Sequence, residues 1–146
     1  MSDKIEYPGA KPGCEFEPLE FVVTPELNQQ YLYAEEDFAP IYLEATDEGP
    51  PMVHPALILN MSNDARSPSF YAPEGMAGLH ARDEVVFLNP ARVGKRLTVA
   101  WKVTDIYAKR ERPYKIVETR VTDEDGLEIL KRFQHVTITI GKKTPD

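Results

Sequence analysis

The segment Pro51-Met-Val-His-Pro-Ala-Leu-Ile-Leu-Asn-Met-Ser-Asn63 decides how the rest of the chain folds. From Val53 to Leu59 it is apolar on nearly every side, and it is too short to span a membrane. Such a segment is either a helix buried all round or a fully covered strand. Ala, Leu and Met favour the helix, and Pro55 suits a first helical position because its missing N–H is not needed there. The segment therefore predicts a buried helix at the centre of the molecule.

The chain downstream of Gly78 has the period of two that is typical of strands. Leu97, Val99, Trp101 and Val103 alternate with smaller or polar residues, which predicts a half-buried strand with Trp101 in the core or an interface. The predicted strands span residues 79–88, 97–109, 114–122 and 127–140. Short turns such as Asp123-Glu-Asp-Gly126 join them, so the pattern predicts an antiparallel meander.

Upstream of the apolar segment we expect a short strand, 19–23, and one amphipathic helix, 25–36. Thr24 offers an N-cap hydroxyl to this helix, and Pro25 follows at its first position. The predicted buried stripe of the helix lies at positions i, i+4 and i+7: Leu27, Tyr31 and Ala34. Residues 43–52 are acidic and form turns, and residues 65–78 are expected to be a surface loop.

Length and composition predict one cytoplasmic domain at residues 19–141, with an irregular arm at 1–18 and a short tail at 142–146. The formal net charge of −7 argues against non-specific binding to nucleic acid or an anionic membrane. Cys14 is the only cysteine, which excludes an internal disulfide and a cysteine-based metal site. Three scattered histidines make any metal site improbable, and the N-terminus lacks the apolar region of a signal peptide.

An antiparallel sheet curved around one buried helix is the α+β architecture called the hot-dog fold. The segment from Tyr33 to Tyr42, Tyr-Ala-Glu-Glu-Asp-Phe-Ala-Pro-Ile-Tyr, resembles the signature of the MaoC-like (R)-specific enoyl-CoA hydratases. The segments 78–99 and 103–119 resemble later strand blocks of the same family. The linked order of the three segments makes the resemblance specific. It implies the hot-dog fold, generally in a dimer with active sites between the protomers.

The resemblance also implies the site. In the family, an aspartate and a histidine activate water for addition to an enoyl thioester, and backbone N–H groups at a helix start commonly stabilise the thioester oxygen. Asp37 matches the family aspartate, whereas Ala39 and Tyr42 stand at the asparagine and histidine positions. A phenol is a poor base at neutral pH. Either another residue replaces the histidine, or Tyr42 acts only as a donor, or this chain is not catalytic.

Two other histidines are candidates for the missing one. His54 starts the buried helix, where it either takes part in catalysis or caps the helix. His80 starts the strand after the loop, where it either reaches the site or shares a polar face with Arg82 and Glu84. His135, in the last strand, is expected to be structural.

Substrate contacts are expected from polar and basic residues. Asn60 is polar on an otherwise apolar helix, so it either bonds to nearby backbone or faces a ligand. The cluster Lys109, Arg110 and Arg112 either is a solvated hairpin end or binds the phosphates of coenzyme A. Arg82 and Arg92 are weaker candidates for the same role.

The leading hypothesis is a MaoC-like hydratase or dehydratase that adds water to an acyl-CoA or another acyl thioester, or removes it. No cofactor is expected beyond the coenzyme A of the substrate. The expected partner is a second hot-dog subunit, identical or different. Two alternatives stay open: a non-catalytic subunit that pairs with a catalytic hydratase, and a hot-dog acyl-CoA thioesterase.

Overall fold

The structure is a computed structural model, and it describes residues 6–140. Five strands form one antiparallel sheet in the order β1–β3–β4–β5–β2. The strands are β1 (Leu19–Val22), β2 (Met76–Phe87), β3 (Arg96–Lys109), β4 (Arg112–Asp123) and β5 (Glu128–Ile140). The helices are α1 (Pro25–Glu35), the 3-10 turn η1 (Pro40–Tyr42), α2 (Pro55–Met61) and the 3-10 turn η2 (Asp64–Arg66). The predicted tail at 142–146 lies outside the described residues.

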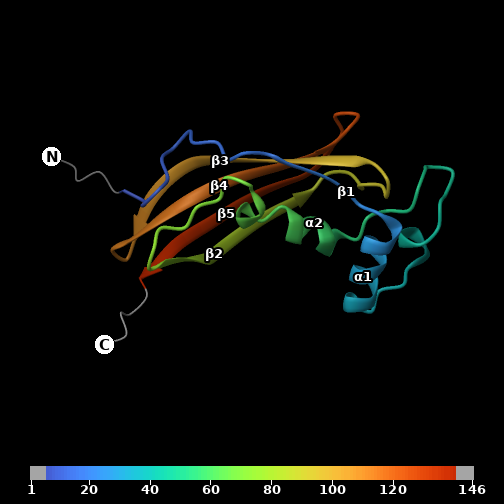
Figure 1. The fold of residues 1–146 in the computed structure, drawn as a ribbon, viewed down its shortest axis with the longest axis horizontal. Helices are drawn as coiled ribbons and strands as arrows, with labels where there is room; N and C mark the ends of the chain where they lie inside the picture. The colour runs from blue at the N-terminus through green and yellow to red at the C-terminus, as the bar shows by residue number, and fades with distance from the viewer. Residues whose placement is uncertain (1–5, 141–146) are drawn as a thin grey trace.

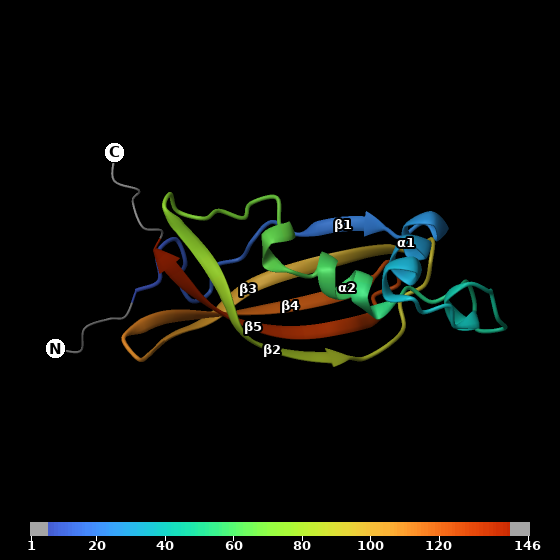
Figure 2. The same cartoon turned by 90° about the horizontal axis from the view of Figure 1, so that it is seen from below.

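The sheet is long and curved, and α2 lies along its concave face (Figures 1 and 2). Helix α1 sits beyond one end of the sheet, and the β3–β4 hairpin forms the opposite end (Figure 1). This arrangement confirms the predicted hot-dog architecture.

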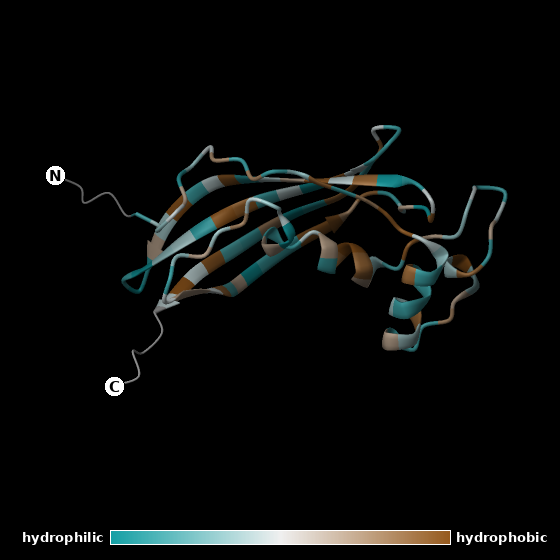
Figure 3. Cartoon of the chain, in the orientation of Figure 1, coloured by the Kyte–Doolittle hydropathy of each residue, from teal (hydrophilic) through white to brown (hydrophobic). Residues whose placement is uncertain are grey.

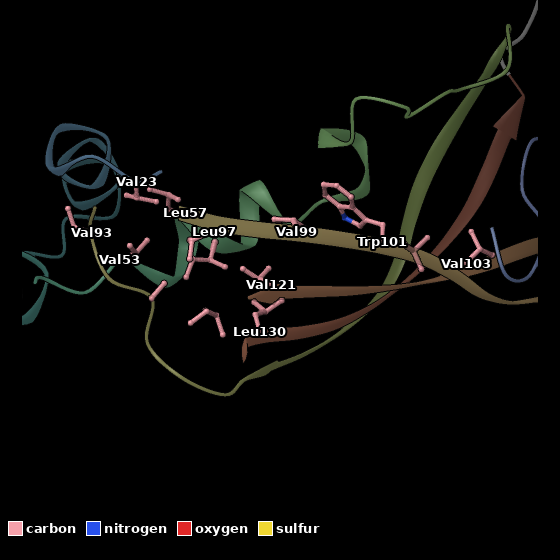
Figure 4. Close-up of a cluster of buried hydrophobic side chains, with 14 of the residues drawn as sticks. Val23, Val53, Leu57, Val93, Leu97, Val99, Trp101, Val103, Val121 and Leu130 are labelled. Carbon is pink, nitrogen blue, oxygen red and sulfur yellow. The ribbon is translucent and has the colours of Figure 1, made fainter. Parts of the chain in front are cut away.

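The core lies between α2 and the concave face of the sheet. The predicted alternation in β3 is confirmed, because Leu97, Val99, Trp101 and Val103 are all buried. Figure 3 shows the resulting alternation of apolar and polar residues along the central strands. Figure 4 shows the buried side chains around β3, which include Trp101. Its indole Nε1 donates to the carbonyl of Ser62 at 2.8 Å, so this core residue also fixes the chain just after α2.

Helix α2 begins at Pro55, as predicted, but it is not covered on all sides. Leu57 and Ile58 are buried, whereas Pro55, Ala56 and Leu59 are only half-buried. The reason is that the sheet covers one side of the helix. The expectation of burial all round was therefore wrong for the single chain, and apolar surface remains beside the helix.

Strand β2 begins at Met76, within the segment predicted to be a loop. Two glycines suggested a break, but Gly78 pairs with Ile138 in the ladder to β5. Strand β5 runs to Ile140 and pairs with β2 as far as Met76, so it extends β2 beyond its predicted start. The rest of the predicted loop contains η2 and a surface segment.

Helix α1 ends one residue before the predicted end, and Thr24 caps it by accepting a hydrogen bond from the N–H of Leu27 at 3.1 Å. The predicted buried stripe is partly wrong. Ala34 is exposed, and the buried residues of the helix are Asn28 and Leu32. Leu27 and Tyr31 of the predicted stripe are half-buried and pack against the core, as expected, while Asn28 and Leu32 beside them are buried more deeply.

Residues 6–18 run along β3 without forming a regular strand. The N–H of Gly13 donates to Val103 O at 2.7 Å, and the N–H of Phe16 donates to Trp101 O at 3.1 Å. Tyr7 and Ala10 are buried against the core. This arm therefore extends the covered surface of the sheet beyond β1.

Strand β2 is the other edge of the sheet and is exposed along most of its length. A bulge interrupts its pairing with β5 between His80 and Arg82. Arg132 of β5 fastens this edge strand: its Nε and Nη2 atoms donate to the carboxylate of Asp83 at 2.6–2.9 Å. Its Nη1 donates to the carbonyl of Leu59 and the hydroxyl of Ser62, so one buried guanidinium joins β2, β5 and the end of α2.

Candidate active site

Asp37 and His54 meet beside the start of α2. The residue before Asp37, Glu36, adopts a left-handed conformation with φ 52°, which ends α1 and turns the chain toward η1. The Oδ1 atom of Asp37 accepts from the N–H of Ala39 at 3.2 Å, which fixes the carboxylate within its own turn. Its Oδ2 atom lies 3.2 Å from Nε2 of His54. The Asp37 side chain is 41% exposed, so solvent or substrate can still reach it.

His54 is the N-cap residue of α2, and this position determines its tautomer. Nδ1 accepts from the N–H of Ala56 at 3.1 Å and so carries no proton. In the neutral ring the proton is therefore on Nε2, which donates it to Asp37. His54 thus caps the helix, as one of the two sequence interpretations expected, and its ring also contacts Asp37.

Tyr42 completes the cluster. Its ring centroid lies 5.0 Å from that of His54, with the ring planes tilted by 48°. Burial raises the pKa of the Tyr42 phenol above the ordinary tyrosine value, and the charge of Asp37 raises it further. The phenol consequently stays protonated at neutral pH and is available as a hydrogen-bond donor.

A buried amide that sequence reasoning missed holds this cluster together. Asn28 of α1 donates through Nδ2 to the carbonyls of Tyr42 and Met52, at 3.2 and 3.0 Å. Its Oδ1 accepts from the backbone N–H of His54 at 2.8 Å. All hydrogen-bonding groups of the amide except one lone pair are thereby used. The apolar spacing of α1 indicated Leu27, Tyr31 and Ala34, and it gave no signal for the polar Asn28.

We expect the Asn28→Leu substitution to lower the free energy of unfolding by about 3 kcal/mol. The change keeps the volume roughly constant but leaves one N–H and two carbonyls without partners, each at a cost of about 1 kcal/mol or more. Urea denaturation followed by circular dichroism measures the effect. Asn89→Leu is the matched control, because the exposed Asn89 amide donates one bond, to Glu128 O. Equal losses in the two variants would contradict the role given to Asn28.

The other predicted site residues lie elsewhere. His80 faces Asp83, with Nε2 3.4 Å from Oδ2, and Arg82 pairs with Glu84. Asn60 accepts from the Arg66 side chain rather than bonding to nearby backbone. Arg92 donates to Pro50 O and Glu48. His135 accepts from or donates to the Tyr107 hydroxyl at 2.9 Å, consistent with a structural role.

The basic cluster lies at the far end of the molecule from Asp37. Lys109, Arg110 and Arg112 surround the turn of the β3–β4 hairpin, opposite α1 (Figures 1 and 2). Within one chain, therefore, this cluster and the Asp37–His54 pair do not form a single site.

The first backbone N–H groups of α2 are not free to donate to a thioester oxygen. Pro55 has no N–H, the N–H of Ala56 is used by His54 Nδ1, and that of Leu57 donates to His54 O. The helix-start donors that the resemblance implies are thus occupied. Tyr42 is the donor left in the cluster.

An apolar cleft of about 240 Å³ is lined by the chain neighbours of His54 but by none of Asp37, Tyr42 and His54 themselves. Val53 and Pro55, on either side of His54, form one wall together with Ile58. Phe87 and Leu88, at the end of β2, form the opposite wall, and both are exposed. The cleft has the apolar lining that an acyl chain requires.

The described residues were also searched for clusters of metal ligands and for helices able to span a membrane. Among residues 6–140, no three histidine, cysteine, aspartate or glutamate side chains are grouped so as to hold a metal ion. None of the helices in this part of the chain is long and apolar enough to cross a membrane.

Comparisons with known proteins give the fold a context. No protein-family model matches the sequence, and no curated protein matches it. Among solved structures, a monoamine oxidase regulatory protein from Archaeoglobus is similar over 97% of this chain and 96% of its own, with a TM-score of 0.75 and 19% identity. A MaoC-like dehydratase from Rhodospirillum rubrum is similar over 92% of this chain and 96% of its own, with a TM-score of 0.71 and 16% identity. An (R)-hydratase from A. caviae involved in PHA biosynthesis is similar over 89% of this chain and 98% of its own, with a TM-score of 0.69 and 17% identity.

Proposed function

We propose that the protein is a MaoC-like hydratase or dehydratase that adds water across the double bond of an enoyl thioester, or removes it. The chain shares the hot-dog fold with a MaoC-like dehydratase and an (R)-hydratase. The observation that carries the proposal is the contact between Asp37 and His54, with the carboxylate open to solvent. A solvent-accessible carboxylate supports the proposal because hydration needs a base that water can reach.

In the proposed mechanism Asp37 is the base. Its carboxylate has about four lone-pair sites, of which Ala39 and His54 occupy two. A free site accepts one proton of a water molecule while the water oxygen bonds to the β-carbon and the double-bond electrons move to the thioester oxygen. The protonated Asp37 then gives this proton to the α-carbon, and the carbonyl re-forms. One water is added and the carboxylate is regenerated, with His54 acting as a positioning residue.

Tyr42 is the proposed donor to the thioester oxygen. Negative charge develops on this oxygen during addition, and a neutral phenol can donate a hydrogen bond to it. The raised pKa of Tyr42 keeps the phenol protonated. The tyrosine found where the family has histidine then has a role as donor rather than as base.

We expect Tyr42→Phe to reduce kcat by about 10²-fold, the effect of removing one donor to a developing oxyanion. Because the aromatic ring is kept, packing on His54 is preserved, and KM should change little. The rate is followed as loss of the conjugated thioester absorbance of crotonyl-CoA and of longer or aromatic enoyl-CoAs. Tyr33→Phe, at an exposed position on α1, is the control. Unchanged kcat in Tyr42→Phe would show that the phenol only packs.

Coenzyme A binding is proposed to need two subunits. The exposed edge strand β2 offers its backbone groups to a second antiparallel strand. Antiparallel pairing of two copies would place the Met76 end of one strand beside the Phe87 end of the other. Lys109, Arg110 and Arg112 of one subunit would then lie toward the Asp37 end of its partner, where they could bind the phosphates of coenzyme A.

The main alternative is a non-catalytic subunit that pairs with a catalytic hot-dog protein. Tyr42 at the histidine position of the resemblance favours it. A thioesterase is the third candidate, because Asp37 could equally direct water to the thioester carbonyl. Incubation with enoyl-CoAs separates the three: loss of the conjugated absorbance supports the hydratase, and release of free thiol supports the thioesterase. Inactivity at all chain lengths, with stable binding to a second hot-dog protein, supports the subunit.

A further inference from the structure

One buried side chain of α1, that of Asn28, is bonded to the main chain of two residues of the candidate site. Its Nδ2 donates to the carbonyl of Tyr42 at 3.2 Å, and its Oδ1 accepts from the N–H of His54 at 2.8 Å. Nδ2 also donates to the carbonyl of Met52 at 3.0 Å. These partners lie 14, 26 and 24 residues away along the chain, so one amide joins three separate segments.

Asn28 takes no direct part in the chemistry. The residue is only 1% exposed, so its side chain offers no surface to a substrate. The two rings whose main chain it holds do belong to the site: the centroids of Tyr42 and His54 are 5.0 Å apart, and Nε2 of His54 lies 3.2 Å from Oδ2 of Asp37. Asn28 can therefore influence the reaction only through the positions of Tyr42 and His54.

A primary amide is the group that this position requires. Two carbonyl oxygens need donors and one N–H needs an acceptor, and the amide supplies two N–H donors beside one oxygen. A carboxylate of the same size has no donor, and an apolar side chain has neither kind of group.

The bond to His54 also directs the imidazole. His54 is the N-cap residue of α2, and its Nδ1 accepts from the N–H of Ala56 at 3.1 Å. Asn28 thus fixes the main chain of His54 while Ala56 fixes one ring nitrogen, and the other nitrogen, Nε2, is left facing Asp37.

We propose that Asn28 is a positioning residue, which holds the Tyr42 phenol and the Asp37–His54 pair in place relative to each other. Its effect on the rate rests on the proposed function, whereas its effect on the His54 ring rests on the contacts alone. Because Asn28 touches no substrate, its loss should lower kcat and leave KM nearly unchanged. A displacement of reacting groups by about 1 Å can cost about 10²-fold in rate.

The kinetic test uses Asn28→Asp, which keeps the size and one acceptor oxygen. Burial raises the pKa of the introduced carboxyl, because its charged form is poorly solvated there. Below that pKa the group is neutral and donates to one carbonyl, whereas above it two carbonyls face a negative oxygen. The ratio of its kcat to that of the parent should therefore fall by about 10²-fold as the pH rises. Circular dichroism at each pH checks that the fold is retained.

The spectroscopic test needs no substrate and uses the ¹⁵N-labelled full chain. The ring nitrogens of the parent His54, assigned by comparison with His54→Gln, should show the neutral tautomer that is protonated at Nε2. In Asn28→Ala the His54 N–H loses its acceptor, so the N-cap is no longer fixed. Exchange between both tautomers should then replace the single one.

Leu32→Ala is the matched control. Leu32 is as deeply buried as Asn28 and lies one turn further along α1, but its side chain has no polar group. The variant should lose stability through lost packing, and it should keep the kcat, the pH profile and the His54 tautomer of the parent. This separates a role in positioning from a general loss of stability.

Three results would overturn the proposal: an unchanged His54 tautomer in Asn28→Ala, a kcat of Asn28→Asp that follows the parent at every pH, or an equal loss of kcat in Leu32→Ala. A parent chain that hydrates no enoyl-CoA would instead refute the proposed function. In that case the His54 tautomer alone would decide whether Asn28 positions the cluster.

Discussion

Asp37→Asn is expected to lower kcat for enoyl-CoA hydration by about 10³-fold and to leave the fold unchanged. General acid–base catalysis by one side chain contributes about 10²- to 10⁴-fold, and in the proposed mechanism Asp37 performs both proton transfers. The amide oxygen of an asparagine can still accept from Ala39 N or from His54 Nε2, which contact Asp37 at 3.2 Å each. The substitution therefore removes the base with little disturbance of its position.

The measurement is the initial rate of loss of the conjugated thioester absorbance under saturating enoyl-CoA. Asp47→Asn, in the exposed acidic turn before α2, is the matched control and should keep the parent rate. Circular dichroism of both variants checks that the fold is retained. A rate within about threefold of the parent in Asp37→Asn would remove Asp37 from the mechanism and with it the proposed reaction.

Arg132→Met is expected to lower the free energy of unfolding by about 3–5 kcal/mol, the usual cost of removing one partner of a buried ion pair. Arg132 is buried and makes bonds to Asp83, Leu59 O and the Ser62 hydroxyl. Methionine fills much of the same volume but leaves these groups without a donor. The edge strand β2 and the end of α2 should both loosen.

Urea denaturation measures the loss, and two further variants make it specific. Arg120→Met removes an exposed arginine whose partners are the half-buried Glu118 and the exposed Glu128, and it should cost less than about 1 kcal/mol. Arg132→Met combined with Asp83→Leu removes both charges and should recover most of the stability. A loss below about 1 kcal/mol in Arg132→Met would mean that solvent compensates the exposed part of Asp83.

Much of the architecture could be predicted from local patterns. The alternation from Leu97 to Val103 defined β3, and the Thr24–Pro25 and His54–Pro55 pairs marked the starts of both helices. These signals are local because burial alternates with the pleat of a strand and because proline is favoured at the first turn of a helix. The hot-dog fold followed from them and from the order of the motifs.

The candidate site was only partly predictable. Asp37, Tyr42 and His54 were identified as candidates, but the contact between Asp37 and His54 joins segments 17 residues apart and depends on the tertiary fold. His80 seemed equally suitable, and its place beside Asp83 follows from the bulge in β2, which has no sequence signal of its own. Asn28 and Arg132 were missed because they stabilise the structure through hydrogen bonds to backbone groups that are distant in the sequence.

The strand order has a consequence for how the chain matures during synthesis. Within residues 6–140, β2 pairs only with β5, so this strand has no neighbour there until Glu128–Ile140 has left the ribosome. Sheets completed by such distant segments fold slowly, and unpaired apolar strands are prone to aggregation in the meantime. Val86, Phe87 and Leu88 are exposed even in the folded chain, so pairing with β5 does not remove the end of this strand from solvent.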